Sequence, residues 1–142
     1  MNSKDYNNYP AYFETDGTTY TVRLRNWDGA FGCASSIKEA QEEAYKLLLD
    51  VFNTHIKEKL TIPTAAPAEK GDFKVKIPLD ISLKIMLINL MRTERYKKAD
   101  IAKGLNIPAQ RMTTFLSLKK NTNLDFFEKA FSYMNRNIEI SI

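Results

Sequence analysis

The chain has 142 residues, 44% of them hydrophobic, which is enough for one packed domain or two small ones. Its single cysteine, Cys33, excludes an internal disulfide and fits a reducing compartment. No run approaches the length of about 18 apolar residues that a membrane-spanning helix needs. The first residues lack the apolar core of a signal peptide, so a cytoplasmic protein without membrane contact is expected.

The net charge of +4 is unevenly placed along the chain. Residues 1–77 carry 10 Lys/Arg and 11 Asp/Glu, a net charge of −1, whereas residues 78–142 carry 11 and 6, a net charge of +5. This asymmetry indicates that the second half binds phosphate groups and that the first half binds a partner of another kind.

The first elements predicted are a β-hairpin and a short third strand. Tyr9 to Glu14 is extended and aromatic, Asp16-Gly17 is a turn signal, and Thr18 to Arg25 alternates between apolar and polar residues. After a second turn at Asn26–Gly29, a third strand is expected near Ala30–Ala34. These elements predict a small antiparallel sheet.

A long helix is predicted to follow the sheet and to cover it. Ser36 is its expected N-cap, with Glu39 completing a capping box, and the helix runs to about Lys57. One apolar stripe should face the sheet, and it consists of Ile37, Ala40, Ala44, Leu47, Leu48 and Val51. A second apolar stripe on this helix consists of Tyr45, Leu49, Phe52 and Ile56, and it forms either a deeper core or a surface for a partner protein. Together with the hairpin aromatic Tyr12, these residues are the candidate partner-binding set.

Thr61 to Gly71 is the linker-like segment, so the sequence predicts two domains, residues 1–71 and residues 72–142. Asp72 to Ile77 alternates as a strand. Pro78 then starts a helix through about Arg95, whose segment Ile81–Met91 is apolar almost all round and needs burial on most sides.

Two short helices separated by a tight turn are predicted next, which is a helix-turn-helix pattern. The first spans about Lys98 to Gly104, Asn106 suits a left-handed turn, and Pro108 opens the second helix. A helical bundle that contacts only protein is the alternative. The exposed start of the second helix would read DNA bases, and flanking lysines would contact phosphates. The candidate DNA-binding residues are Ala109, Gln110, Arg111, Thr113, Thr114, Lys97, Lys98, Lys119 and Lys120.

Near the C-terminus, Thr122 and Asp125 resemble a capped start of a helix reaching Asn135. Ile138, Ile140 and Ile142 alternate with polar residues, which predicts a terminal strand.

Residues for catalysis or metal binding are hard to find. His55 is the only histidine, it lies on the apolar side of the long helix, and Cys33 has no histidine near it in sequence. The acids Glu14, Asp16 and Asp28 fall at strand ends and turns, where carboxylates are common solvated residues. We therefore expect no enzyme, no metal site and no cofactor.

The order of these elements resembles the HicB antitoxin family over nearly the whole chain. The residues carrying the resemblance are Tyr9-Pro10, the Gly17 turn, Tyr20-Thr-Val22, Ser36-Ile-Lys-Glu-Ala40, Ile62-Pro63, Val75-Lys-Ile-Pro-Leu79 and the Ile101-Ala102 helix-turn-helix. One loop departs from it. Family members often show Asp-x-Pro-Gly and then Thr-x-Gly, whereas this chain has Asn26-Trp27-Asp28-Gly29 and Ala34.

The resemblance implies an α+β fold, with a degraded ribonuclease-H-like sheet covered by one helix, followed by an all-helical helix-turn-helix domain with a terminal strand. It implies an antitoxin whose N-terminal domain masks a small HicA-type toxin, an mRNA-cleaving ribonuclease. The C-terminal domain would bind operator DNA as a dimer or higher homo-oligomer and repress its own operon. The toxin is expected to be basic because it holds RNA, which suits a less basic N-terminal half.

Two other classes remain open from the sequence. A stand-alone helix-turn-helix regulator would use the N-terminal domain to sense a ligand or to dimerise. A nuclease would need at least three carboxylates converging on a metal.

Overall fold

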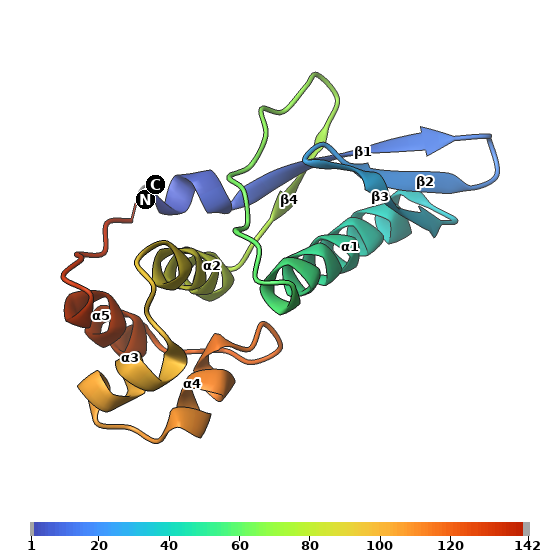
Figure 1. The fold of residues 1–142 in the computed structure, drawn as a ribbon. Coiled ribbons are helices and arrows are strands. Elements are labelled where there is room, and N and C mark those ends of the chain that lie inside the picture. Colours follow the sequence, from blue (N-terminus) through green and yellow to red (C-terminus); the bar gives the residue numbers. More distant parts are fainter. Residues whose placement is uncertain (1, 141–142) are drawn as a thin grey trace. The chain divides into compact units, whose positions relative to one another are not determined.

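The structure, a computed structural model, describes residues 2–140. The chain forms two compact units (Figure 1). Residues 5–77 make a sheet covered by a helix, and residues 1–4 with 78–142 make a helical unit. A short 3-10 helix, η1, spans Ser3–Tyr6. The expected mixed architecture, with an N-terminal antiparallel sheet, is confirmed.

The sheet has four strands in the order β3-β2-β1-β4, and every neighbouring pair is antiparallel. The hairpin prediction is confirmed. At its turn, Asp16 Oδ1 accepts hydrogen bonds from the amides of Thr18 (2.8 Å) and Thr19 (2.7 Å), and Gly17 has a φ of +94°, which glycine adopts without steric cost. The strands are β1 (Asn8–Thr15), β2 (Tyr20–Leu24), β3 (Trp27–Ala34) and β4 (Phe73–Lys76).

The third strand is longer than predicted, because it starts at Trp27 rather than near Ala30. Trp27 lies opposite Leu24, but the next pair in the ladder joins Arg23 and Phe31. The intervening residues 28–30 therefore have no opposite residue on β2, and they form an irregular, bulged segment. Alternation in the sequence does not reveal this, because a bulge breaks the two-residue period.

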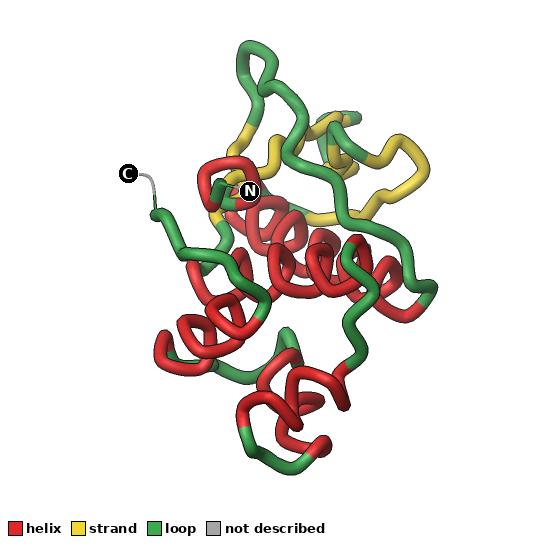
Figure 2. Tube along the Cα trace, turned by 60° about the vertical axis from the view of Figure 1, so that its left-hand side comes forward, coloured by secondary structure: helices red, strands yellow, loops and turns green. Residues whose placement is uncertain are grey.

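Helix α1 (Ile37–Lys57) covers the sheet, as predicted (Figure 2). Ser36 caps it by accepting from the Glu39 amide at 3.1 Å. The expected capping box differs in detail, since the Glu39 carboxylate accepts from the amide and hydroxyl of Ser35 rather than from the cap residue. The buried stripe also differs from the prediction, because Ile37 is 49% exposed and Phe52 is fully buried. The helix buries Ala40, Ala44, Leu48 and Phe52.

The linker-like segment is held against the sheet unit. Ile62 is fully buried, and the Tyr9 hydroxyl donates to the Pro63 carbonyl at 2.6 Å. Asn26 bridges to the same segment, donating to the Thr64 carbonyl (2.9 Å) and accepting from the Ala66 amide (2.9 Å). The segment thus leads in a fixed path to β4, which pairs with β1.

The helical unit contains α2 (Leu79–Thr93), α3 (Lys98–Leu105), α4 (Ala109–Leu116) and α5 (Leu124–Tyr133). Every residue of α2 from Ile81 to Met91 is buried, which confirms the burial predicted for this apolar segment. Asn106 ends α3 in the left-handed conformation (φ 57°, ψ 47°), as its short polar side chain allows. Pro108 is the residue before the first turn of α4.

Two predictions at the C-terminal end are wrong. Asn123, not Thr122, caps α5, by accepting from the Phe126 amide at 3.0 Å. Residues 138–140 are not in a strand, because no other described segment forms a ladder with them; residues 141–142 lie outside the described part of the chain. Ile138 instead lines a cavity of about 220 Å³ together with Leu83, Met86, Leu90 and Phe131.

Candidate functional site

Helix α4 presents one apolar and one polar side. Met112 and Leu116 are buried, whereas the predicted base-reading residues are all exposed. The side chain of Gln110 makes no hydrogen bond to any described residue, so its amide is available to a ligand. The structure brings together on this exposed side Ala109, Gln110, Arg111, Thr113 and Thr114.

Arg111 is held at the side of this surface. Its guanidinium lies 5.2 Å from the ring centre of Phe115, and Phe115 stacks on Phe126 with ring centres 4.4 Å apart. The charge therefore rests on an aromatic pair that belongs to the core of the helical unit. The arrangement restricts the Arg111 side chain and keeps its cation exposed.

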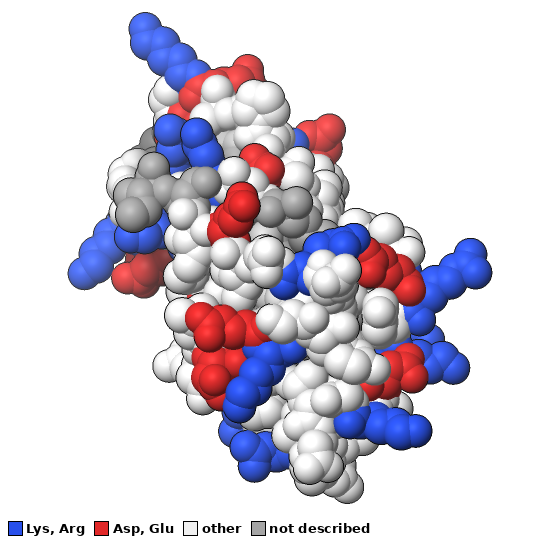
Figure 3. Space-filling view, turned by 90° about the vertical axis from the view of Figure 1, so that its left-hand side faces the viewer, with Lys and Arg blue, Asp and Glu red and all other residues white. Residues whose placement is uncertain are grey.

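The four lysines predicted to contact phosphate are also exposed. Lys97 and Lys98 lie at the start of α3, and Lys119 and Lys120 follow α4. On the face shown in Figure 3, basic side chains are interspersed with acidic ones and do not form one continuous patch. The four lysines thus lie at the start of α3 and after the end of α4 in the chain.

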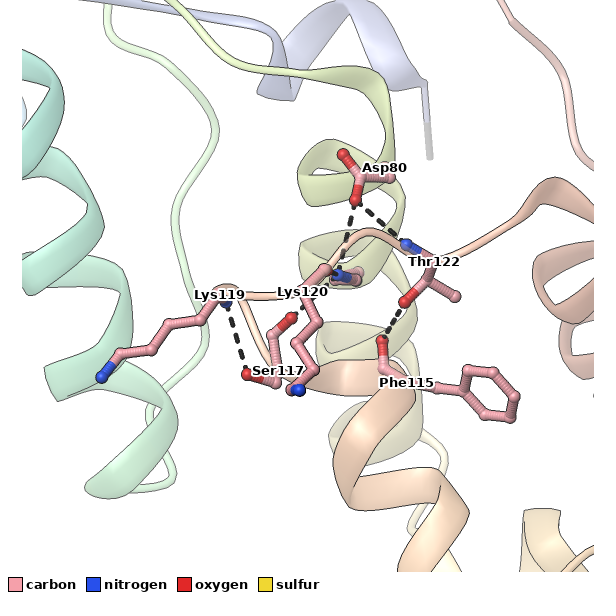
Figure 4. A network of polar contacts seen from close by, with 7 residues as sticks. Asp80, Phe115, Ser117, Lys119, Lys120 and Thr122 are labelled. Atoms are coloured by element: carbon pink, nitrogen blue, oxygen red, sulfur yellow. Dashed lines mark hydrogen bonds and ion pairs between the residues drawn. The ribbon is translucent and has the colours of Figure 1, made fainter.

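The segment after α4 is fixed by a buried lysine, Lys84, that sequence reasoning missed. Figure 4 shows the labelled residues of this network, from Asp80 to Thr122. The side chain of Lys84, on α2, is fully buried. Its ammonium donates to the carbonyls of Ser117 (2.8 Å) and Lys120. It also lies 3.4 Å from Asp80 Oδ2. Burial lowers the pKa of the Lys84 ammonium, and Asp80 opposes this shift. The available signal was an Asp four residues before a Lys within an apolar helix.

Asp80 extends the same network towards α5. Its Oδ2 accepts from the Thr122 amide at 3.4 Å, and the Thr122 hydroxyl donates to the Phe115 carbonyl at 2.7 Å. Lys119 extends away from this network in Figure 4. The network thus fixes the backbone that carries two of the predicted phosphate-binding lysines.

The residues predicted to bind a partner protein do not form one surface. Tyr45, Leu49 and Ile56 are half-buried on α1. Phe52 is fully buried, with its ring centre 5.2 Å from that of Tyr9, so it belongs to the core of the sheet unit. Tyr12 lies on the other face of the sheet from Tyr9, because side chains alternate along a strand, and Arg25 stacks on its ring at 3.9 Å.

A concave surface not predicted from the sequence lies between the start of β3 and the C-terminal half of α1. Its volume is about 490 Å³. Its residues come from the segment that departs from the family pattern and from α1. We call it the Trp27 groove, lined by Trp27, Asp28, Gly29, Ala30, Asp50, Val51, Thr54 and His55.

His55 is a half-buried histidine with both ring nitrogens in contact with the protein. Trp27 Nε1 lies 3.4 Å from His55 Nε2, and His55 Nδ1 lies 3.0 Å from the Val51 carbonyl. The indole N–H can only donate, so Nε2 accepts and Nδ1 carries the proton. Both ring nitrogens thus have a partner within the sheet unit, so His55 serves structure.

Among the described residues, no group of three or more His, Cys, Asp and Glu side chains is placed to hold a metal ion. The acids considered from the sequence are separate. Glu14 pairs with Arg23 at 2.7 Å, Asp16 closes the hairpin turn, and Asp28 lines the Trp27 groove. No helix in residues 2–140 is long and apolar enough to cross a membrane.

Comparison with known proteins gives one consistent result. Residues 8–86 match the model of a family described as "HicB_like antitoxin of bacterial toxin-antitoxin system". "Antitoxin HicB 2" of Photorhabdus laumondii is 28% identical over 132 residues, covering 93% of this chain and 94% of the relative. "Antitoxin HicB" of Escherichia coli strain K12 is 23% identical over 121 residues, covering 85% and 88%. "Antitoxin HicB 1" of Photorhabdus laumondii is 24% identical over 135 residues, covering 94% and 86%.

Proposed function

The chain belongs to the HicB-like antitoxin family, and we propose that it masks a small HicA-type mRNA ribonuclease toxin and, as a dimer, binds operator DNA to repress its own operon. The family consists of antitoxins and not of enzymes. The observation that carries the proposal is the family match, which spans the whole sheet from β1 to β4.

Toxin masking is assigned to the unit of residues 5–77. Its four antiparallel strands and covering helix are compatible with a degraded ribonuclease-H-like fold. The acids considered from the sequence serve other purposes: Asp16 closes the hairpin turn, Glu14 pairs with Arg23 and Asp28 lines the Trp27 groove. The net charge of −1 over residues 1–77 suits a basic partner.

DNA binding is assigned to α3, the Asn106 turn and α4, acting as a helix-turn-helix. Three features support this assignment: the left-handed Asn106, the exposed polar side of α4 and the net charge of +5 over residues 78–142. Gln110 can pair bidentately with adenine, and exposed lysines can position the phosphates. One such unit makes few contacts, so we propose a dimer that reads half-sites about 34–36 Å apart.

Co-expression with the small open reading frame beside this chain's gene tests the proposal. We expect that reading frame alone to arrest growth and this chain to restore growth. The variant Gln110→Ala should restore it equally well, because masking does not use the DNA-reading surface. Growth arrest that persists at full expression of a folded chain would contradict the masking function and favour a stand-alone regulator.

A further inference from the structure

The Trp27 groove exists because β3 is irregular where it approaches α1. Residues 28–30 have no opposite residue on β2, so they bulge out of the ladder. A bulge re-aims side chains and is frequent beside binding sites. Here it supplies one wall of the groove, and Asp50, Val51, Thr54 and His55 of α1 supply the other.

The floor of the groove is apolar and aromatic. Trp27 is half-buried, stacks on Tyr9 with ring centres 5.8 Å apart, and meets Phe52 edge to face at 6.1 Å. Its indole N–H is already engaged by His55. The ring is therefore fixed by the core of the unit, and Ala30 and Val51 add aliphatic surface beside it.

The charged residues that line the groove are acidic. Asp28 lies on the β3 wall and Asp50 on the α1 wall, and both are exposed. Within residues 2–140, neither carboxylate takes part in an ion pair or a side-chain hydrogen bond. Two carboxylates without an ion pair, beside an aromatic floor, therefore favour a cation.

A basic side chain meets these requirements. Its aliphatic stem can lie along Trp27, Ala30 and Val51 while its charged head reaches the carboxylates of Asp28 and Asp50. An aromatic face also attracts a cation directly, and a guanidinium adds planar stacking and two parallel hydrogen bonds to a carboxylate. The groove is open to solvent, so a long side chain of a partner can enter it.

The neighbouring strand adds a second means of attachment. β3 is at the edge of the sheet, so one side of its backbone pairs with β2 and the other side has no strand beside it in the described chain. Open strand edges are templates for a strand of another protein. A partner that aligns with β3 would bring its side chains to the groove.

We propose that the Trp27 groove receives a basic side chain of the toxin; this inference rests on the proposed masking function. Charge complementarity identifies the partner chemistry, because an RNA-cleaving toxin carries basic residues and the groove carries unpaired carboxylates. The groove thereby replaces the Tyr45, Leu49, Phe52 and Ile56 stripe as the principal contact on α1.

The test uses the full chain and the protein encoded by the neighbouring reading frame, purified as a variant that does not cleave RNA. The double variant Asp28→Asn with Asp50→Asn removes both charges and keeps side-chain shape. We expect its dissociation constant to rise at least tenfold, with a weaker dependence on salt. The control Glu42→Gln removes an exposed charge of α1 outside the groove and should leave the dissociation constant unchanged.

A second readout needs no substitution in the groove. Trp27 is the only tryptophan of the chain, so incorporation of 5-fluorotryptophan gives one fluorine resonance in an NMR spectrum. Adding the toxin should shift that resonance, even if the double variant does not fold.

Three results would overturn the inference. Tight toxin binding with a fluorine resonance that does not move would place the contact elsewhere and leave masking intact. Equal losses in the double variant and in Glu42→Gln would show a general charge effect rather than a groove. Absence of binding by the wild-type chain would overturn both the groove and the masking function.

Discussion

Replacing Lys84 by methionine tests whether the buried ammonium holds the helical unit together. Methionine keeps most of the side-chain volume, so the change removes the donor rather than packing. The carbonyls of Ser117 and Lys120 and the Asp80 carboxylate would each lose a partner.

The expected cost follows from what is left unsatisfied. Each buried acceptor that loses its only donor costs about 1–3 kcal/mol. The loss is partly offset at two of the acceptors, because the Ser117 carbonyl keeps a long contact from the Lys120 amide (3.4 Å) and Asp80 Oδ2 keeps the Thr122 amide (3.4 Å). The Asp80 side chain is also 20% exposed, so water can reach its carboxylate. Removing a buried charge also recovers some desolvation free energy. We therefore expect Lys84→Met to lower the free energy of unfolding by about 2–3 kcal/mol.

The chain provides a matched control in Lys129→Met. Lys129 pairs with Asp125, also four residues earlier on a helix, at 3.0 Å, but the two side chains are 64% and 67% exposed. An exposed pair of this kind contributes about 0.5 kcal/mol or less. Urea unfolding followed by circular dichroism at a helix wavelength gives both values. Equal losses in the two variants would refute the structural role assigned to Lys84.

Three further predictions concern DNA binding, acid stability and the C-terminal tail. Gln110→Ala should relax sequence preference, whereas Lys119→Ala should weaken binding to all duplexes alike; a binding-site selection assay separates the two outcomes. Arg25 donates two hydrogen bonds to Asp72 (2.9 and 2.8 Å), and these hold the pKa of the Asp72 carboxyl below its usual value. The stabilisation that this pair provides is therefore present at neutral pH and is lost as the pH falls through about 4 and below. Arg25→Met should therefore lower the melting temperature at pH 7 and reduce the wild-type fall between pH 5 and pH 3; an unchanged fall would contradict this cause. Truncation after Asn137 should yield monomers by light scattering, because we propose that the tail with its exposed Ile140 contributes to the dimer; a dimeric product would place the interface elsewhere.

The features that sequence reasoning found depend on local chemistry. The Asp16-Gly17 turn, the Ser36 cap and the left-handed Asn106 each follow from a residue that satisfies nearby backbone groups. The long buried run of α2 was visible because an unbroken apolar segment needs burial wherever it lies.

The features that it missed depend on residues far apart in the chain. Phe52 lies on the flank of a helical wheel, yet Tyr9 and Trp27 enclose it. The Lys84 ammonium finds its acceptors more than thirty residues later, at Ser117 and Lys120. The residues of the Trp27 groove lie together only because the bulged strand β3 packs against α1 in the folded chain.

The predicted terminal strand shows a different limit. Ile138 and its neighbours alternate between apolar and polar residues as a strand does, but this pattern describes one strand and not the strand with which it would pair. A β-strand requires hydrogen bonds to a neighbouring strand, and no other described segment pairs with residues 138–140.

Inhibition of RNA cleavage tests the central claim, that this chain masks a ribonuclease toxin, most directly. The protein of the neighbouring reading frame would be incubated with mRNA while the purified full chain is added in increasing molar ratio. Masking predicts that cleavage falls in proportion to added chain and stops near stoichiometric equivalence, with Gln110→Ala equally effective. Undiminished cleavage in the presence of a molar excess of folded chain would contradict the account.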